Sequence, residues 1–365
     1  MADSSISDAN SYATLVEEQK KQSTSTADVQ DFTSGKYDLE TDYAYRSAAA
    51  GGFLTQMQTF LTGLDRFSRN VLPTNCEHSG LTFITRPKLN FTSSSLRQDS
   101  KLLPLDSINP TDFTFMIRAL LDTKFSKEPK NRAMESPWIN IKNPFNVPLC
   151  NSLVSISGFP DPVLQTLTTE GGYFSEDQTF VIGSDRENRT YDLSLTFKDI
   201  HYGPVLAIME FWHQYMANVA DGTVVAYKED IDAQRLNYTV SIYRFMLDPT
   251  RKYVTRYAKA TGCFPKSPPL GAVFNVNEGE LTASAIKKFT IPFVANKIEY
   301  NKVEILTDFR TLVRRYCSDI ESLSIVPPEP IHNFTGIPWI ATTKNGIELQ
   351  FRASETEIKN NIFTV

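Results

Sequence analysis

Apolar and polar residues alternate in three segments of the second half of the chain, 191–198, 237–245 and 288–295. Successive side chains of a β-strand point to opposite faces, so this pattern predicts half-buried strands. Pro292 in the third segment favours a sheet edge or a bulge, because proline has no backbone N–H to donate. The side chains that we expect on the sheet are Tyr191, Leu193, Leu195, Phe197, Tyr238, Val240, Ile242, Phe289, Ile291 and Phe293.

Between the first two strands the apolar residues recur at steps of three and four, which is the stripe of an amphipathic helix over 203–219. We expect this helix to cover the sheet, with Trp212 as its anchor. Its covering side chains are Ile208, Met209, Trp212 and Met216. The same spacing predicts a second helix over 302–320. A sheet crossed by a helix is a packing unit and carries no chemistry by itself.

Turn-forming residues suggest how other segments pair. Residues 178–182 are predicted to form a hairpin with 191–197 across the loop 183–188. Near the C-terminus, Asn345-Gly346 separates two short strand-like segments, and Asn-Gly is a strong hairpin signal. A lone hairpin is marginal in water, so this one should join a sheet, its own or a partner's. We expect the proline-rich linker 327–330 to hold it away from its own domain, so that it becomes ordered only on neighbouring chains.

The pattern gives an α+β fold class: an antiparallel β-sandwich or barrel with a covering helix. Residues 1–50 are too polar to fold alone, and they form either a disordered tail or an arm that becomes ordered on a neighbouring subunit. A helical stripe follows over 53–67. The expected organisation is 1–50, polar N-terminal arm; 51–170, helical and extended elaboration; 171–320, β domain; and 321–365, linker and C-terminal hairpin.

Charge and composition exclude several classes. The net charge of −5 argues against a broad basic face for nucleic acid, although it is compatible with DNA inside an acidic lumen. No apolar run is long enough to cross a bilayer, and the N-terminus lacks a signal-peptide pattern, so we expect no membrane insertion and a reducing cytoplasm. The four cysteines lack the spacing of zinc ligands.

No motif for nucleotide binding, nucleophilic catalysis or metal hydrolysis occurs. His213 lies three residues after Glu210 in the aromatic helix, but such pairs are common on helices. His201 suits a turn or cap. We therefore predict no catalytic, cofactor-binding or metal-ligating residues and no cofactor.

Taken together, three features resemble the tail-tube family of contractile-tailed bacteriophages, and within it the baseplate proteins that cap the hub and start the tube. They are the loop 186–190, the strand leading into the aromatic helix centre 208–216, and the late strand 289–294. The resemblance covers about 178–303. It implies a six-fold ring whose adjacent subunits share a continuous inner β-barrel, with the helices outside.

The resemblance implies a structural virion protein and not an enzyme. The ring would lie at the junction of baseplate and tail tube, and would initiate or extend the tube around the DNA ejection channel. Its partners would be copies of itself in a hexamer and other tail or baseplate proteins, with DNA only passing through the lumen. It would be assembled in the host cytoplasm and reside in the virion tail. The alternatives are another tail or neck component, or a cytoplasmic enzyme with a dispersed site.

Overall fold

The computed structural model describes residues 79–107, 109, 111–127, 139–173, 177–183, 189–199, 203–248, 250–273, 288–326, 336–344 and 346–354. The chain divides into two units, Met1–Asn75 and Cys76–Val365, and every described residue belongs to the second. The expectations for the arm 1–50, the helix 53–67 and the linker 327–330 lie outside the described residues.

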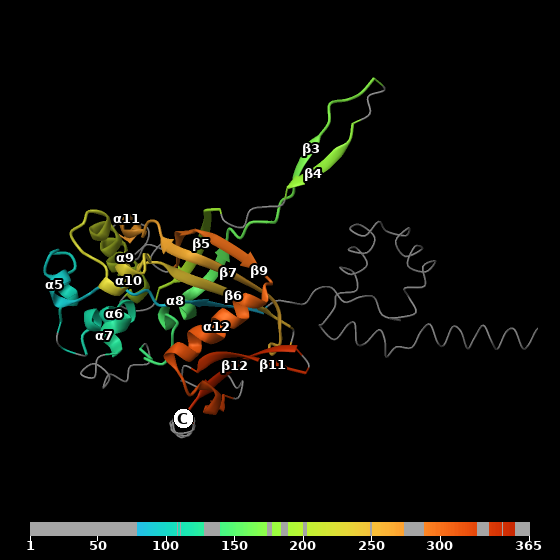
Figure 1. Cartoon of the computed structure of the whole chain (residues 1–365). Helices are drawn as coiled ribbons and strands as arrows, with labels where there is room; N and C mark the ends of the chain where they lie inside the picture. Colours follow the sequence, from blue (N-terminus) through green and yellow to red (C-terminus); the bar gives the residue numbers. More distant parts are fainter. Residues whose placement is uncertain are drawn as a thin grey trace, which may run out of the picture. The chain divides into compact units, whose positions relative to one another are not determined.

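The main sheet has seven strands within the described part of the chain, all paired antiparallel (Figure 1). Its order is β1-β6-β7-β8-β5-β2, and β9 also pairs with β7. The strands are β1 (Ser79–Ile84), β2 (Leu153–Ser157), β5 (Tyr191–Lys198), β6 (Val240–Leu247), β7 (Val254–Pro265), β8 (Lys288–Ala295) and β9 (Lys297–Tyr300). The order ends at β1 and β2, so the sheet is open.

The sheet changes partners at an irregularity beside Gly262. The end of β7 pairs with β8, whereas its middle pairs with β9, and Asn296 lies between these two strands. Gly262 has φ +69°, and an added Cβ would lie 2.9 Å from the Asn296 side chain. The Asn296 N–H donates to the Thr261 carbonyl at 3.1 Å. A residue with a side chain would be strained at position 262, so glycine allows the close approach here.

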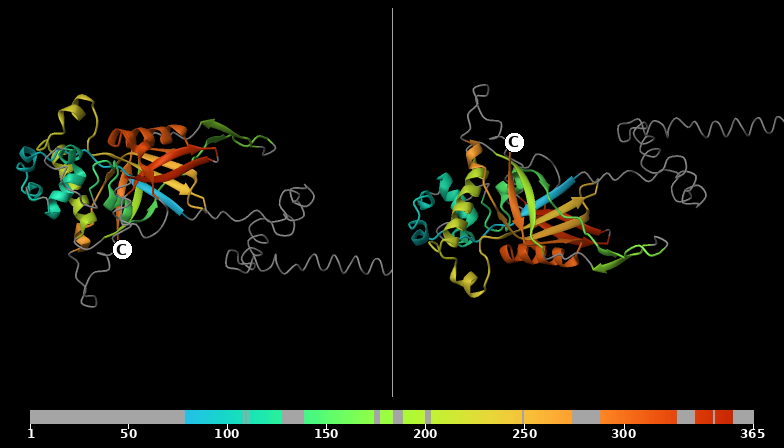
Figure 2. Two further views of the ribbon diagram at one scale, coloured as in Figure 1. Left: turned by 90° about the horizontal axis from the view of Figure 1, so that it is seen from below. Right: turned by 90° about the horizontal axis from the view of Figure 1, so that it is seen from above.

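Helix α9 (Pro204–Ala220) covers one face of this sheet. Trp212 is fully buried, and its indole N–H donates to the Tyr238 carbonyl at 3.0 Å. The indole packs edge-on against Phe293 of β8, with ring centroids 6.1 Å apart. Among the described residues, α9 and the strands therefore share one core. Shorter elements complete this side (Figure 2): α5 (Ser93–Leu96), η2 (Leu103–Leu105), α6 (Phe113–Leu121), α7 (Thr123–Lys127), α8 (Val147–Ser152), α10 (Lys228–Asp232) and α11 (Leu270–Val273).

A second core lies against the other face of β1, β6 and β7. Helix α12 (Val303–Tyr316) places Phe309 at its centre, fully buried against Phe83, Tyr243 and Phe245. A three-stranded sheet, ordered β10-β12-β11, packs against α12. Its strands are β10 (Ser324–Ile325), β11 (Ile337–Thr343) and β12 (Gly346–Ala353), and the 3-10 helix η4 (Ile320–Ser322) precedes them.

The α+β class and the antiparallel sheets are confirmed, but within the described residues the sheets are open and do not close into a barrel. The sheet also draws β1 and β2 from before residue 170, where the sequence suggested an elaboration outside the β domain.

Two pairing predictions are wrong. The segment 178–182 belongs to β4 (Thr179–Gly183), which pairs with β3 (Gln165–Thr168) and not with β5. Alternation and a turn signal identify a strand but not its partner, and β5 is already flanked by β2 and β8. The C-terminal hairpin β11-β12 forms as expected, but it packs on its own α12 and is not held away from its own domain.

Candidate assembly surfaces

The structure places the residues predicted for an inter-subunit sheet in the interior of the main sheet. Five of the side chains are fully buried or 1% exposed on β5 and β8: Leu193, Leu195, Phe197, Ile291 and Phe293. Val240 and Ile242 are buried on β6, Phe289 is 8% exposed, and Tyr191 is half-buried. Tyr238 lies two residues before β6 and is also half-buried. Of the covering residues, Ile208, Met209 and Trp212 are fully buried and Met216 is half-buried.

These strands already have partners on both sides within the chain. β5 lies between β2 and β8, and β6 lies between β1 and β7. The continuation of the sheet across subunits stays a prediction. If it occurs, it must use a strand with an open edge among the described residues, namely β1, β2 or β9, because an edge strand presents unpaired N–H and C=O groups.

The hairpin β3-β4 is the feature that the sequence did not reveal. In Figure 1 it projects from the main sheet, and its two strands pair only with each other among the described residues. The Thr168 and Thr179 hydroxyls are 3.0 Å apart across it, and the Thr169 N–H donates to the Gln178 carbonyl at 2.9 Å. Two strands without a covering layer are marginally stable in water, so this hairpin needs a partner.

Exposed apolar side chains concentrate on this hairpin and on the strand that leads into it. Eight of the fourteen exposed large hydrophobic residues in the described part of the chain lie between positions 154 and 182. Leu167 pairs with Phe180 on one face, exposed by 54% and 53%, while Val181 points to the other face at 62%. The remaining five are Val154, Val163, Leu164, Tyr173 and Ile182. Exposed apolar side chains gathered in one part of a chain favour an interaction site.

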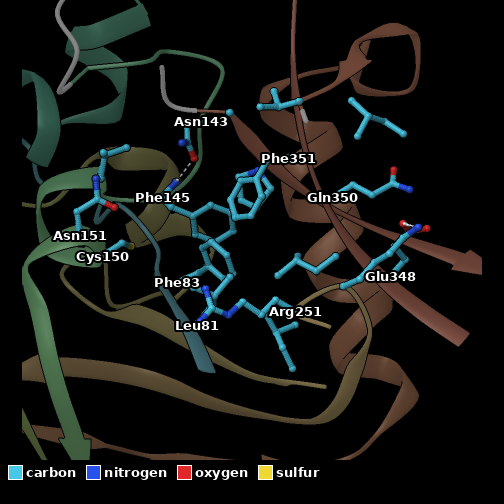
Figure 3. Close-up of a pocket in the computed structure, with 18 of the residues that line it drawn as sticks. Leu81, Phe83, Asn143, Phe145, Cys150, Asn151, Arg251, Glu348, Gln350 and Phe351 are labelled. Atoms are coloured by element: carbon cyan, nitrogen blue, oxygen red, sulfur yellow. Dashed lines mark hydrogen bonds and ion pairs between the residues drawn. The ribbon is translucent and has the colours of Figure 1, made fainter. Parts of the chain in front are cut away.

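A groove beside β1 offers a second surface. Figure 3 shows Phe83 of β1, Phe145 and Phe351 of β12 close together in its wall. The ring centroid of Phe83 is 5.2 Å from that of Phe145 and 6.4 Å from that of Phe351. The cavity measures about 860 Å³, and an ion pair between Lys252 and Glu348, 3.1 Å long, lies on its rim. An apolar groove next to an end strand can accept an added chain segment.

The groove also contains a cysteine without the features of a reactive thiol. The Ile84 N–H donates to the Cys150 sulfur at 3.2 Å, and burial raises the pKa of the Cys150 thiol to about 12. Burial likewise raises the pKa of Cys263 to about 12. A nucleophilic cysteine needs a lowered pKa, so both thiols are packing residues. Within the described residues, no group of three or more His, Cys, Asp or Glu side chains could hold a metal ion.

His213 does not form a catalytic pair in the described structure. Its Nδ1 is buried without a hydrogen-bond partner among the described residues. His201 lies outside the described residues. No helix of the described chain is long and apolar enough to cross a membrane.

Comparison with known proteins identifies the family. A family model described as "Putative phage tail tube protein" matches residues 18–326. The match covers most of the chain, so the protein belongs to this family and is a structural component of the phage tail. No curated protein matches the chain.

Solved structures give only weak likenesses. The cap that terminates the tube of the anti-feeding prophage is 13% identical, with 47% of this chain and 95% of the cap covered and a TM-score of 0.25. The sheath/tube terminator of the extracellular contractile injection system PVC is 10% identical. The match covers 41% of this chain and 85% of the terminator chain, with a TM-score of 0.23. A chain of the PVC sheath-tube complex is 13% identical. The match covers 41% of this chain and 80% of that chain, with a TM-score of 0.22.

Proposed function

We propose that this chain is the subunit of a homo-oligomeric ring, a hexamer, at the junction of the baseplate and the tail tube. The ring initiates or extends the tube around the channel through which DNA leaves the virion. The observation that carries the proposal is the apolar β3-β4 hairpin, which has no covering layer among the described residues.

The gain from covering the hairpin is large enough to drive assembly. Fully burying one large apolar side chain contributes about 1.5–3 kcal/mol. Leu167, Phe180, Val181 and Ile182 are each more than half exposed, so several such contributions are available in one contact. Part of this gain is offset by the lost freedom of two subunits.

The ends of the sheet support a ring in particular. β1 and β2 lie at opposite ends of the strand order, and the hairpin follows β2 in the chain. Two different surfaces that meet head to tail generate a closed ring when the rotation between subunits closes. The number six comes from the family resemblance and not from the geometry.

The position at the baseplate junction is supported by what the chain adds to its family. β11 and β12 lie beyond residue 326, where the family match ends. They build an additional sheet on α12, and the groove of Figure 3 runs beside it. Such an addition suits a ring that also binds another tail or baseplate protein. DNA would only pass through the lumen, and the proposal assigns no catalytic step and no cofactor.

Negative-stain microscopy of the purified full-length protein, followed by antibody labelling of intact virions, tests the proposal. We expect hollow six-fold rings and label at a single level, where the tube meets the baseplate. Label along the whole tube would identify the repeating tube subunit, and label at the neck would identify a neck component. A monomer at every concentration would contradict the ring.

A further inference from the structure

A basic cleft lies away from the hairpin and the groove. It is lined by the residues after β1, by helices α7, α10 and α12, by the residues between α10 and β6, by strands β6 and β7, and by Pro144. Its volume is about 490 Å³, which lies within the range of roughly 300–1,000 Å³ typical of binding pockets. Seven basic and three acidic side chains line it, counted over the described residues.

Most of these basic side chains have no ion-pair partner among the described residues. Lys124 pairs with Glu229 at 3.1 Å, and Lys259 pairs with Asp308 at 2.6 Å. The other five basic side chains form no ion pair with any described residue. These are Arg86, Lys88, Lys127, Arg235 and Arg315.

Repulsion between these cations is visible at Lys127. Burial lowers the pKa of Lys127, and the neighbouring charges of Arg86, Lys88 and Arg315 lower it further. The ammonium group lies over the Tyr316 ring, 4.3 Å from its centroid, which holds it at the cleft. Basic side chains that outnumber the carboxylates of a cleft, here seven against three among the described residues, favour the binding of an anion.

Arg86 forms the floor of the cleft and is 6% exposed. Its Nε donates to the Leu120 carbonyl at 3.1 Å, and its Nη2 donates to the Ala119 carbonyl and to the Ser126 hydroxyl. Nη1 makes no hydrogen bond with the described residues. A guanidinium whose Nη1 has no hydrogen-bond acceptor can donate from that nitrogen to a carboxylate.

The β3-β4 hairpin carries the opposite charge. Residues 143–185, which include the hairpin, contain five acidic side chains and no lysine, arginine or histidine. Glu170 and Asp177 lie on either side of the turn and are exposed. The hairpin is therefore apolar along its strands and acidic toward its tip, whereas the cleft is basic with tyrosine in its wall.

We propose that the acidic tip of the hairpin in one copy docks into the basic cleft of a second copy, with Glu170 and Asp177 facing Lys88, Lys127, Arg235 and Arg315. This inference rests on the proposed ring and names the contact that links its subunits. Strands β3 and β4 project away from α7 and α10 in their own chain (Figure 1), so the hairpin and the cleft are two different surfaces. Two complementary surfaces that lie apart on one subunit produce a head-to-tail contact.

A charge exchange tests the docking in the full-length protein. The tip variant Glu170→Lys with Asp177→Lys, and the cleft variant Arg235→Glu with Arg315→Glu, each place like charges together. We expect each to raise the protein concentration needed for ring formation at least about tenfold in sedimentation velocity. The chain that carries all four substitutions should recover rings, because attraction returns with its sign reversed. A mixture of the two variants should also form rings.

The controls match the charge change at other positions. Lys101→Glu with Lys198→Glu reverses two exposed lysines that line neither the cleft nor the groove, and this variant should assemble like the wild type. If the tip and cleft variants weaken the rings but the fourfold variant does not recover them, the tip docks elsewhere and the inference is wrong. If the tip and cleft variants form rings at the same protein concentration as the wild type, the docking inference is wrong, although the proposed ring is not contradicted. A wild-type chain that never assembles contradicts both.

Zero-length carbodiimide cross-linking gives a second measurement that needs no variant. Mixed rings of nitrogen-14 and nitrogen-15 chains should yield links from Glu170 or Asp177 to Lys88 or Lys127 that join the two isotopes. High salt should reduce these links, because about 1 M salt shortens the screening length to roughly 3 Å. Links to Lys101 or Lys198, both exposed and outside the cleft, at equal frequency would overturn the inference.

Discussion

Two hairpins of this chain have similar backbone pairing and opposite surroundings. In β11-β12, Trp339 and Ile340 are 5% and 0% exposed, and they pack with α12 in the second core. In β3-β4, Phe180 and Val181 are 53% and 62% exposed, with no layer over either face among the described residues. The first hairpin stabilises its own subunit. The second has apolar surface that no described residue of its own chain covers, and we propose that another chain does so.

The difference separates two uses of the same element. Substitutions in β11-β12 should change the free energy of unfolding of the monomer, whereas substitutions in β3-β4 should change the free energy of association. Each of the following substitutions tests this division.

The largest loss in the free energy of unfolding is expected at Trp212, a fully buried aromatic residue with which the hairpin substitutions can be compared. Trp212→Ala removes the packing on Phe293 and leaves the Tyr238 carbonyl without its donor. We expect a loss of about 3–5 kcal/mol in the free energy of unfolding, measured by urea denaturation of the full-length protein. Unchanged stability would show that α9 does not cover the sheet.

Trp339→Ala should follow closely, because the indole is nearly fully buried and the Arg314 guanidinium carbon lies 5.3 Å from its ring centroid. The expected loss in the free energy of unfolding is about 3 kcal/mol or more. Urea denaturation again provides the measurement. A loss below about 0.5 kcal/mol would mean that the C-terminal sheet is detached in solution, and the contrast between the hairpins would disappear.

On the projecting hairpin, Val181→Asp with Ile182→Asp should leave the free energy of unfolding of the monomer within about 0.5 kcal/mol of the wild type, since both side chains are exposed. Association should weaken by about 2 kcal/mol or more, because an apolar contact is replaced by charge. Sedimentation velocity measures the association. Val225→Asp with Val303→Asp, which adds two charges at apolar positions outside the hairpin that are 59% and 68% exposed, is the matched control. If both variants weaken association equally, the apolar side chains of the hairpin do not form the contact between subunits.

The smallest effect concerns the thiol in the groove. The pKa of Cys150 is raised to about 12, so the neutral thiol persists throughout the ordinary pH range, and roughly one molecule in ten thousand carries the thiolate at pH 8. Labelling with a thiol-reactive dye should therefore be slow in the wild type. It should become faster in Trp339→Ala, because the C-terminal sheet forms part of the groove wall. Fast labelling of wild-type Cys150, identified by mass spectrometry, would contradict the closed packing.

The elements with strong periodicity could be predicted from the sequence, and their partners could not. α9 and β5 were predicted within one residue at each end, because one buried face imposes a period on the side chains. β4 has three apolar residues in a row, Phe180, Val181 and Ile182, and such a run does not say which strand lies beside it. Its pairing with β3 is decided by tertiary geometry.

The candidate surfaces were missed for related reasons. The cleft gathers Arg86, Lys127, Arg235 and Arg315 from four places in the chain, and no local pattern connects them. One signal was visible in the sequence: residues 143–185 lack any basic side chain. A long acidic and apolar segment beside otherwise mixed charge indicates a specialised surface, although it does not identify what that surface contacts.

The central claim is that a neighbouring copy covers the β3-β4 hairpin, and an electron cryomicroscopy map of the assembled full-length protein tests it most directly. The account predicts a closed ring in which Phe180 and Val181 of each subunit are buried against the next subunit. A map in which these side chains stay in solvent while the subunits meet through other surfaces would contradict it.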